Sequence, residues 1–112
     1  MHPDARALLW DARSALALVL EFVDRRSWEI YQSDPMLRSA VERQFQIVGD
    51  ALNRLSRVDP ETAAGIPDLP RVVAFRNVLV HGYAVIDDEL VWEVAITRAA
   101  PLSRMLDRLL AS

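Results

Sequence analysis

The stretch from Phe75 to Tyr83 is mostly apolar but contains four strongly polar or titratable side chains, those of Arg76, Asn77, His81 and Tyr83. A histidine that titrates near neutral pH can act as a general base or a general acid. A neighbouring arginine can hold a phosphate group and stabilise the negative charge that builds on it in the transition state. Together, these two groups are sufficient for metal-independent cleavage of RNA, with the ribose 2′-hydroxyl as the nucleophile.

One copy of this segment supplies a single histidine, whereas cleavage by this route uses both an acid and a base. The only other histidine, His2, stands near the N-terminus, far from His81 in the sequence. Two copies related by a twofold axis would bring two such segments together and supply the second group. The segment therefore predicts a homodimer as well as a reaction.

The same segment also has a purely structural interpretation. Gly82 favours the end of a helix, where Arg76 and Asn77 would satisfy nearby carbonyls and His81 would pack against the terminus. If the segment is helical, Asn77 and His81 lie one turn apart on one face, and Arg76 aligns approximately with Tyr83 two turns on. The pattern alone leaves both interpretations open.

The composition excludes several other kinds of site. The chain has no cysteine, which excludes thiolate zinc sites, disulfide scaffolds and cysteine nucleophiles, and its two histidines have no recognisable metal-ligand spacing. All 13 basic residues are arginine, so lysine chemistry and a P-loop are excluded. The acidic residues 87–89 suit the first turn of a helix better than a magnesium site. We therefore expect neither a metal nor another cofactor.

Length, charge and hydrophobicity indicate one globular domain over residues 1–112. Of the 112 residues, 52% are hydrophobic, enough for one core. The longest apolar run, residues 15–20, is much shorter than the roughly 20 residues of a membrane helix, and the N-terminus lacks the basic region of a signal peptide. A net charge of −3 argues against non-specific nucleic-acid binding but permits a local basic site. We expect a cytoplasmic protein without membrane contact.

Apolar residues recur at helical spacing along almost the whole chain, which predicts an all-α protein. A first helix is expected to follow the N-cap Asp4 and to end near Arg25 and Arg26, before a short helical turn over residues 28–31. The dipeptide Asp34-Pro35 signals the start of a long second helix, which the apolar pattern ends near residue 57.

Residues 58–70 contain three prolines and form the one clear loop that the sequence predicts. A third helix is expected to begin at Pro70 and to end at Gly82. A fourth should begin after Asp87 and kink at Pro101. Four main amphipathic helices with mostly short connections predict an antiparallel four-helix bundle with one short extra turn.

The motif Arg-x4-His-x-Tyr, formed by Arg76, His81 and Tyr83 with Asn77 directly after the arginine, resembles the signature of HepT-like toxins. These toxins belong to the HEPN superfamily of all-helical ribonucleases. Residues 40–43 and 47–51 resemble the second-helix signature of that family, which usually has glutamate where Asp50 stands.

The resemblance extends over roughly residues 4–110. Residues 85–87 and 90–92 are similar to the segment that follows the family motif, and Pro101 with Leu102 fits the closing helix. The chain departs from the family at residues 66–70, where an aromatic residue often precedes the third helix.

The resemblance implies a homodimeric bundle in which Arg76 and His81 of both protomers line a shared RNA-cleaving cleft, with Asn77 and Asp50 as supporting residues. It also implies a type VII toxin–antitoxin pair, whose MntA-like nucleotidyltransferase antitoxin transfers AMP from ATP to the motif tyrosine, here Tyr83. A bulky anion beside Arg76 and His81 would occupy the phosphate site and repel RNA. ATP is then a substrate of the partner, and this chain needs no cofactor.

Two other functions stay open on the sequence alone. In one, the chain is a non-catalytic dimeric module that binds nucleotide, RNA or a partner protein, so that replacing His81 changes affinity rather than turnover. In the other, the chain is the antitoxin-like or substrate subunit of a nucleotidyltransferase pair. A neighbouring transferase gene would fit both the toxin and this last alternative.

Overall fold

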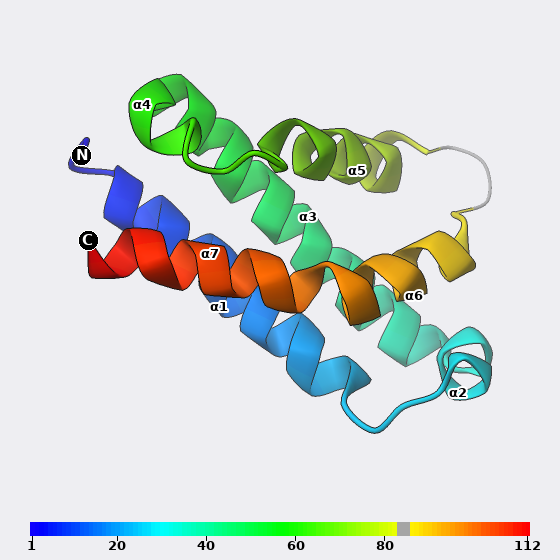
Figure 1. Cartoon of the computed structure of the whole chain (residues 1–112). Helices are drawn as coiled ribbons and strands as arrows, with labels where there is room; N and C mark the ends of the chain where they lie inside the picture. The colour runs from blue at the N-terminus through cyan, green and yellow to red at the C-terminus, as the bar shows by residue number, and fades with distance from the viewer. Residues whose placement is uncertain (83–85) are drawn as a thin grey trace.

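The computed structural model describes residues 1–82 and 86–112, which are mainly helical (Figure 1). The helices are α1 (Ala5–Val23), α2 (Trp28–Ser33), α3 (Pro35–Val58), α4 (Pro60–Ala63), α5 (Leu69–His81), α6 (Asp88–Thr97) and α7 (Ala99–Ala111). No strand occurs in these two stretches of chain, which confirms the all-α prediction. Across the same stretches, no helix has the length and hydrophobicity of a membrane span.

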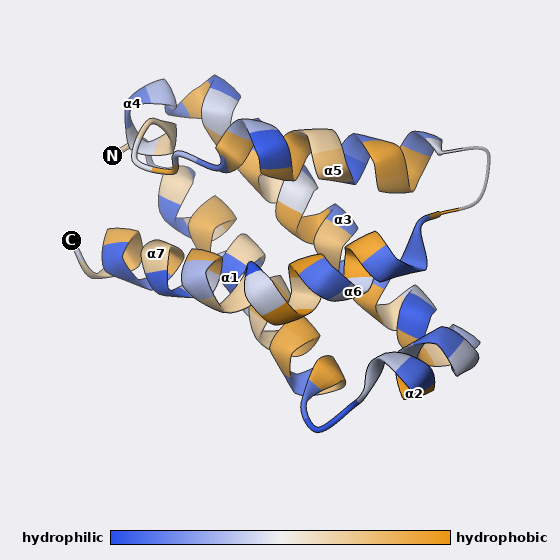
Figure 2. Ribbon diagram, turned by 45° about the vertical axis from the view of Figure 1, so that its right-hand side comes forward, coloured by the Kyte–Doolittle hydropathy of each residue, from blue (hydrophilic) through white to orange (hydrophobic). Residues whose placement is uncertain are grey.

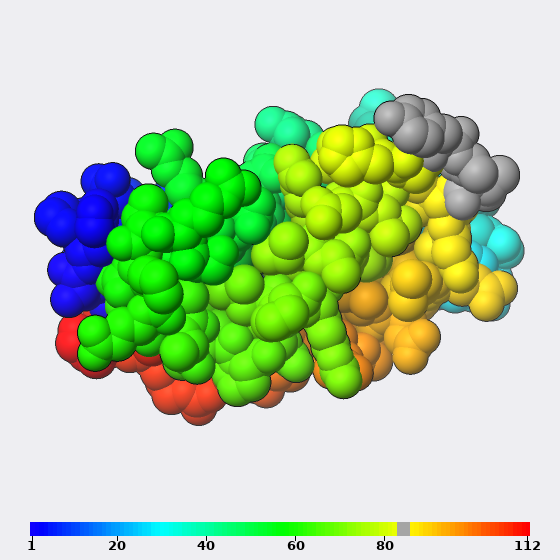
Figure 3. Space-filling model, turned by 90° about the horizontal axis from the view of Figure 1, so that it is seen from above, coloured from blue at the N-terminus to red at the C-terminus, as the bar shows by residue number. Residues whose placement is uncertain are grey.

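The long helices run in alternating directions, as an antiparallel four-helix bundle requires (Figure 1). α1 packs against α3 and α7, and α5 packs mainly against α3. The fourth helix of the bundle is divided into two segments, α6 and α7. Both chain ends lie at one end of the bundle, where Arg6 donates a hydrogen bond to the carbonyl of Leu110. Seen from above, α4 and α5 cover one face, with α6 and α7 along its edge (Figure 3).

Local signals explain where several helices begin. The side chain of Asp34 accepts a hydrogen bond from the Leu37 N–H at 3.0 Å, and Pro35 occupies the first turn of α3, as predicted. In the same way, Asp87 caps α6 by accepting from the Leu90 N–H at 3.2 Å. Asp4 occupies the N-cap position of α1, as predicted, but its side chain makes no capping hydrogen bond.

The predicted loop over residues 58–70 contains a helix, α4, that the sequence analysis missed. Its start repeats the Asp-Pro signal of α3, because Asp59 accepts hydrogen bonds from both the N–H and the hydroxyl of Thr62. The predicted kink at Pro101 is also displaced, since the helix already breaks at Arg98. A proline ring collides with the carbonyl four residues earlier, here that of Thr97, so the break falls where α6 ends.

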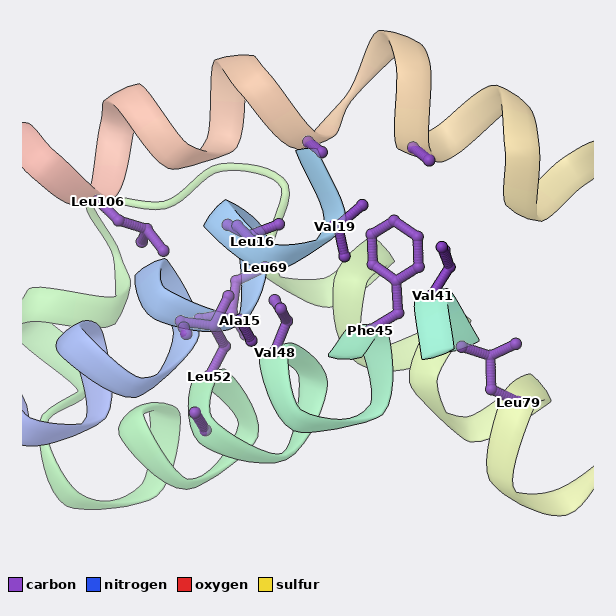
Figure 4. Packing of buried hydrophobic residues seen from close by; sticks show 14 of the residues in the cluster. Ala15, Leu16, Val19, Val41, Phe45, Val48, Leu52, Leu69, Leu79 and Leu106 are labelled. Carbon is purple, nitrogen blue, oxygen red and sulfur yellow. The ribbon is translucent and has the colours of Figure 1, made fainter. Parts of the chain in front are cut away.

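Each long helix turns an apolar side inward (Figure 2). Leu16 and Val19 of α1, Val48 and Leu52 of α3 and Leu106 of α7 point toward one another in the core (Figure 4). Burial of such side chains contributes about 1.5–3 kcal/mol each and stabilises the bundle against the entropy of the unfolded chain.

The contact of α5 with α3 is aromatic. The rings of Phe45 and Phe75 meet edge to face, with centroids 5.3 Å apart. Leu69 and Leu79 are buried near the two ends of α5 and fix its orientation on the bundle. The helix that carries the polar motif is therefore held mainly against α3.

Candidate active site

The motif residues lie on the C-terminal half of α5. Leu79 faces the core, whereas Asn77 and His81 are exposed one turn apart on the same helix. The helix ends at His81, as predicted, where the Gly82 N–H donates to the carbonyl of Val78 at 2.8 Å. A Cβ at position 82 would stand 2.5 Å from that carbonyl oxygen, so glycine is needed at this end of the motif helix.

Arg76 is held by two side-chain acceptors. Its Nε donates to Oδ1 of Asp50 on α3 at 2.5 Å, and its Nη1 donates to Oδ1 of Asn77 at 2.9 Å. The arginine side chain is 24% exposed, so the guanidinium lies at the surface with its stem covered. Within residues 1–82 and 86–112, Nη2 makes no hydrogen bond, so its N–H groups remain available to an anion.

Gly49 admits the stem of Arg76 to this position. A Cβ built on Gly49 would lie 2.2 Å from Cβ and 2.5 Å from Cγ of Arg76, far inside contact distance. Two consecutive residues of α3 thus position the Arg76 side chain, because Gly49 makes room for its stem and Asp50 binds its guanidinium. Gly49 was not among the predicted site residues, although a glycine inside a helix, which costs about 1 kcal/mol relative to alanine, was a signal.

The structure brings three of the predicted site residues together. Asp50, Arg76 and Asn77 form one hydrogen-bonded cluster, which we call the Arg76 cluster. His81 follows on the last turn of α5, and it makes no hydrogen bond or ion pair with the described part of the chain. Tyr83 lies outside the described residues.

The acidic residues at the start of α6 have structural partners. Asp87 caps the helix, and a carboxylate oxygen of Asp88 lies 3.6 Å from Nε of Arg38 on α3. Among residues 1–82 and 86–112, no group of three potential ligands is arranged to hold a metal ion. These acids thus act in the structure as the sequence analysis proposed, at a helix N-terminus.

An apolar groove borders the Arg76 cluster. It lies between α1 and α3, has a volume of about 450 Å³, and is lined by Trp10, Leu18, Ile47, Asp50 and Arg54 among others. Trp10 is 56% exposed, and the guanidinium of Arg13 lies 5.0 Å from its ring centroid. Tryptophan is a residue type that is enriched in protein–protein interfaces.

Comparison with known proteins gives a consistent result. The family model described as Ribonuclease HepT-like matches residues 12–109. A protein of Methanocaldococcus jannaschii, named as a candidate RNase, is 30% identical over 91 residues, which cover 81% of this chain and 83% of that protein. Another candidate RNase, from Caldanaerobacter subterraneus subsp. tengcongensis, is 25% identical over 82% of this chain and 81% of its own length. No solved structure gives a significant match.

The family match spans α3 and α5, the two helices that build the Arg76 cluster, and both relatives are covered over most of their length. The chain belongs to the HepT-like ribonuclease family.

Proposed function

We propose that this protein is a toxin of a type VII toxin–antitoxin pair and that it cleaves RNA without a metal, using Arg76 and His81. The observation that carries this proposal is the Arg76 cluster, in which Asp50 and Asn77 hold a surface guanidinium whose Nη2 makes no hydrogen bond to residues 1–82 or 86–112. The family name, and the RNase names of the relatives, support RNA as the substrate.

The proposed reaction is an internal transesterification. His81 accepts the proton of the ribose 2′-hydroxyl, and the 2′-oxygen attacks the adjacent phosphorus. Arg76 binds the non-bridging oxygens and stabilises the charge that develops on them. The bond to the 5′-oxygen breaks, that oxygen receives a proton, and the products carry a 2′,3′-cyclic phosphate and a 5′-hydroxyl group.

The proton for the leaving oxygen requires a second titratable group, which we assign to His81 of a second copy of the chain. The groove between α1 and α3 supports such a dimer, because it is mostly apolar and continues directly to Asp50 of the Arg76 cluster. A copy seated there buries the exposed Trp10 and brings a second motif helix toward the first. Trp10→Glu should therefore yield a monomer in analytical ultracentrifugation and abolish cleavage.

The regulatory part of the proposal concerns Tyr83. An MntA-like nucleotidyltransferase transfers AMP from ATP to its phenolic oxygen, which loses its proton as a bond to the α-phosphorus forms and pyrophosphate leaves. The added phosphate then competes with RNA for Arg76. The test incubates the protein with ATP and such a transferase, followed by intact-mass measurement. Tyr83→Phe should gain no AMP and stay active. Tyr31→Phe, which changes the only other tyrosine, a buried one, should be modified like the unchanged protein.

The decisive experiment compares RNA cleavage in EDTA by the unchanged protein, His81→Ala, Arg76→Ala and Arg104→Ala. We expect a loss of at least about 100-fold for the two motif variants, which remove a base or a phosphate ligand. Arg104 is exposed on α7 and serves as the matched control, which should cleave normally. Circular dichroism verifies that all four proteins are folded.

Three outcomes would contradict the proposal. Cleavage that survives both motif substitutions would exclude the Arg76 cluster from the chemistry. Cleavage that EDTA abolishes would exclude the metal-independent route. If the unchanged protein cleaves nothing although its intact mass shows no AMP, the chain is a binding module rather than a ribonuclease.

A further inference from the structure

We propose that a second site, distinct from the Arg76 cluster, binds a small amphipathic carboxylate: an apolar chain or ring that ends in a carboxylate group. The site is a cavity of about 250 Å³ between α5 and the junction of α6 with α7. This inference does not depend on the proposed ribonuclease activity.

The interior of this cavity is apolar. Its floor is formed by the core residues Phe45 and Val48, one wall by Val72 and Phe75 of α5, and the other by Val94 and Leu102 of α6 and α7. An apolar cavity of about 150 Å³ in another protein accommodates benzene, so this cavity has room for a larger apolar group.

The mouth of the cavity is polar and carries a net positive charge. Arg71 on α5 and Arg98 before α7 line it from opposite sides, together with a single acid, Asp68. Both arginines are exposed, and neither forms an ion pair with residues 1–82 or 86–112. Arg98 stands at the junction where α6 ends and α7 begins, so the positive charge at the mouth comes from the two guanidinium groups.

An apolar interior with two arginines at its mouth fits a ligand that has an apolar part and a negatively charged end. The apolar part fills the cavity, and the carboxylate accepts hydrogen bonds from one or both guanidinium groups. Such a ligand would lie between α5 and the helices α6 and α7, with which α5 makes few contacts of its own. Binding should therefore raise the melting temperature of the protein.

The test is calorimetric titration of the full chain with decanoate, below the concentration at which decanoate forms micelles. Decanol, with the same chain and no charge, is the matched ligand. We expect saturable binding of one decanoate per chain, at least about tenfold weaker binding of decanol, and a loss of about tenfold in Arg71→Ala and in Arg98→Ala. Arg104→Ala, an exposed arginine of α7 that does not line the cavity, should bind decanoate normally.

A further variant tests the interior. Val72→Phe should fill the cavity and abolish decanoate binding, with folding checked by circular dichroism. The proposal is overturned if decanoate shows no saturable binding, if decanol binds equally well, or if Arg71→Ala and Arg98→Ala bind like Arg104→Ala. None of these measurements uses RNA, so their failure is distinguishable from failure of the proposed reaction.

Discussion

Gly49 of α3 lies directly against the stem of Arg76 of α5, so closely that a Cβ at position 49 would stand 2.2 Å from the Cβ of the arginine. This is a contact between backbone and side chain, and it sets how near the motif helix can approach α3. The carboxylate of Asp50, the next residue, then reaches the guanidinium. The position of the proposed catalytic arginine thus depends on a residue that has no side chain.

Gly49→Ala should impair both the fold and the reaction. Alanine gains about 1 kcal/mol in helix propensity over glycine, but overpacking at a contact this short costs about 1–3 kcal/mol. We therefore expect a net decrease of about 1 kcal/mol in the free energy of unfolding, measured in urea, and a decrease of at least about tenfold in RNA cleavage because Arg76 is displaced.

Ser39→Ala, at an exposed position of the same helix, is the control for the introduction of alanine and should leave both quantities unchanged. A Gly49→Ala protein that is more stable and fully active would show that α5 moves without consequence for the site.

Asp50 should act as a positioning residue for Arg76, and the charge of its carboxylate should matter more than its shape. Asp50→Asn keeps an oxygen acceptor but removes the charge-assisted hydrogen bond, so cleavage should decrease by at least about tenfold. Asp50→Glu restores the carboxylate, with the residue usual in the family, and should recover cleavage to within a few-fold. Stability should change by less than about 1 kcal/mol, because the Asp50 side chain is 49% exposed. Equal activity of the two variants would argue against this role.

Features that depend on residues close together in the sequence were predictable from it, whereas features that depend on contacts between helices were not. Asp34-Pro35 and Asp87 start helices through hydrogen bonds within a few residues, so their patterns are readable. The break at Arg98 was misplaced because a proline acts on the carbonyl four residues before it, a distance the pattern does not mark.

The site shows the same division. Arg76, Asn77 and Asp50 were selected from motif signatures, and the structure joins all three. The close approach at Gly49 spans two helices, and a glycine inside a helical pattern does not say which side chain it admits. The cavity lined by Arg71 and Arg98 spans several helices and has no local sequence pattern.

Asp59 should make the stability of the protein sensitive to acid. The backbone N–H of His2 donates to its carboxylate at 2.8 Å, and Thr62 adds hydrogen bonds from its hydroxyl and its N–H. These bonds, that of His2 first, lower the pKa of Asp59 from 3.8 to about 2. Because the folded state lowers the pKa, the stabilisation is complete above the unfolded value and is lost as the pH falls from about 4 toward about 2.

Asp59→Asn should therefore be less stable than the unchanged protein at neutral pH, and the difference should shrink as the pH falls through this range. Urea unfolding at a series of pH values measures it. Glu61→Gln replaces an exposed acid of the same short helix and should leave the stability at neutral pH nearly unchanged. A difference between Asp59→Asn and the unchanged protein that is constant with pH would contradict the assignment.

Replacement of Tyr31 by phenylalanine should stabilise the protein. Its side chain is fully buried between Trp28 and Trp92, with ring centroids 6.2 and 5.2 Å away, and its hydroxyl has no hydrogen-bond partner among the described residues. Burial raises the pKa of Tyr31, and the negative charges of Glu42 and Asp88 raise it further, so the hydroxyl stays neutral.

An unpaired buried hydroxyl costs about 1–3 kcal/mol, whereas the ring contacts are independent of it. Tyr31→Phe should therefore raise the free energy of unfolding by about 1 kcal/mol. Tyr31→Leu, which loses the aromatic contacts as well, should lower it by about 1 kcal/mol or more. Urea unfolding at neutral pH measures both variants. A Tyr31→Phe protein that is clearly less stable would show that the hydroxyl is hydrogen-bonded in solution, and the contact among α2, α3 and α6 would then depend on that bond.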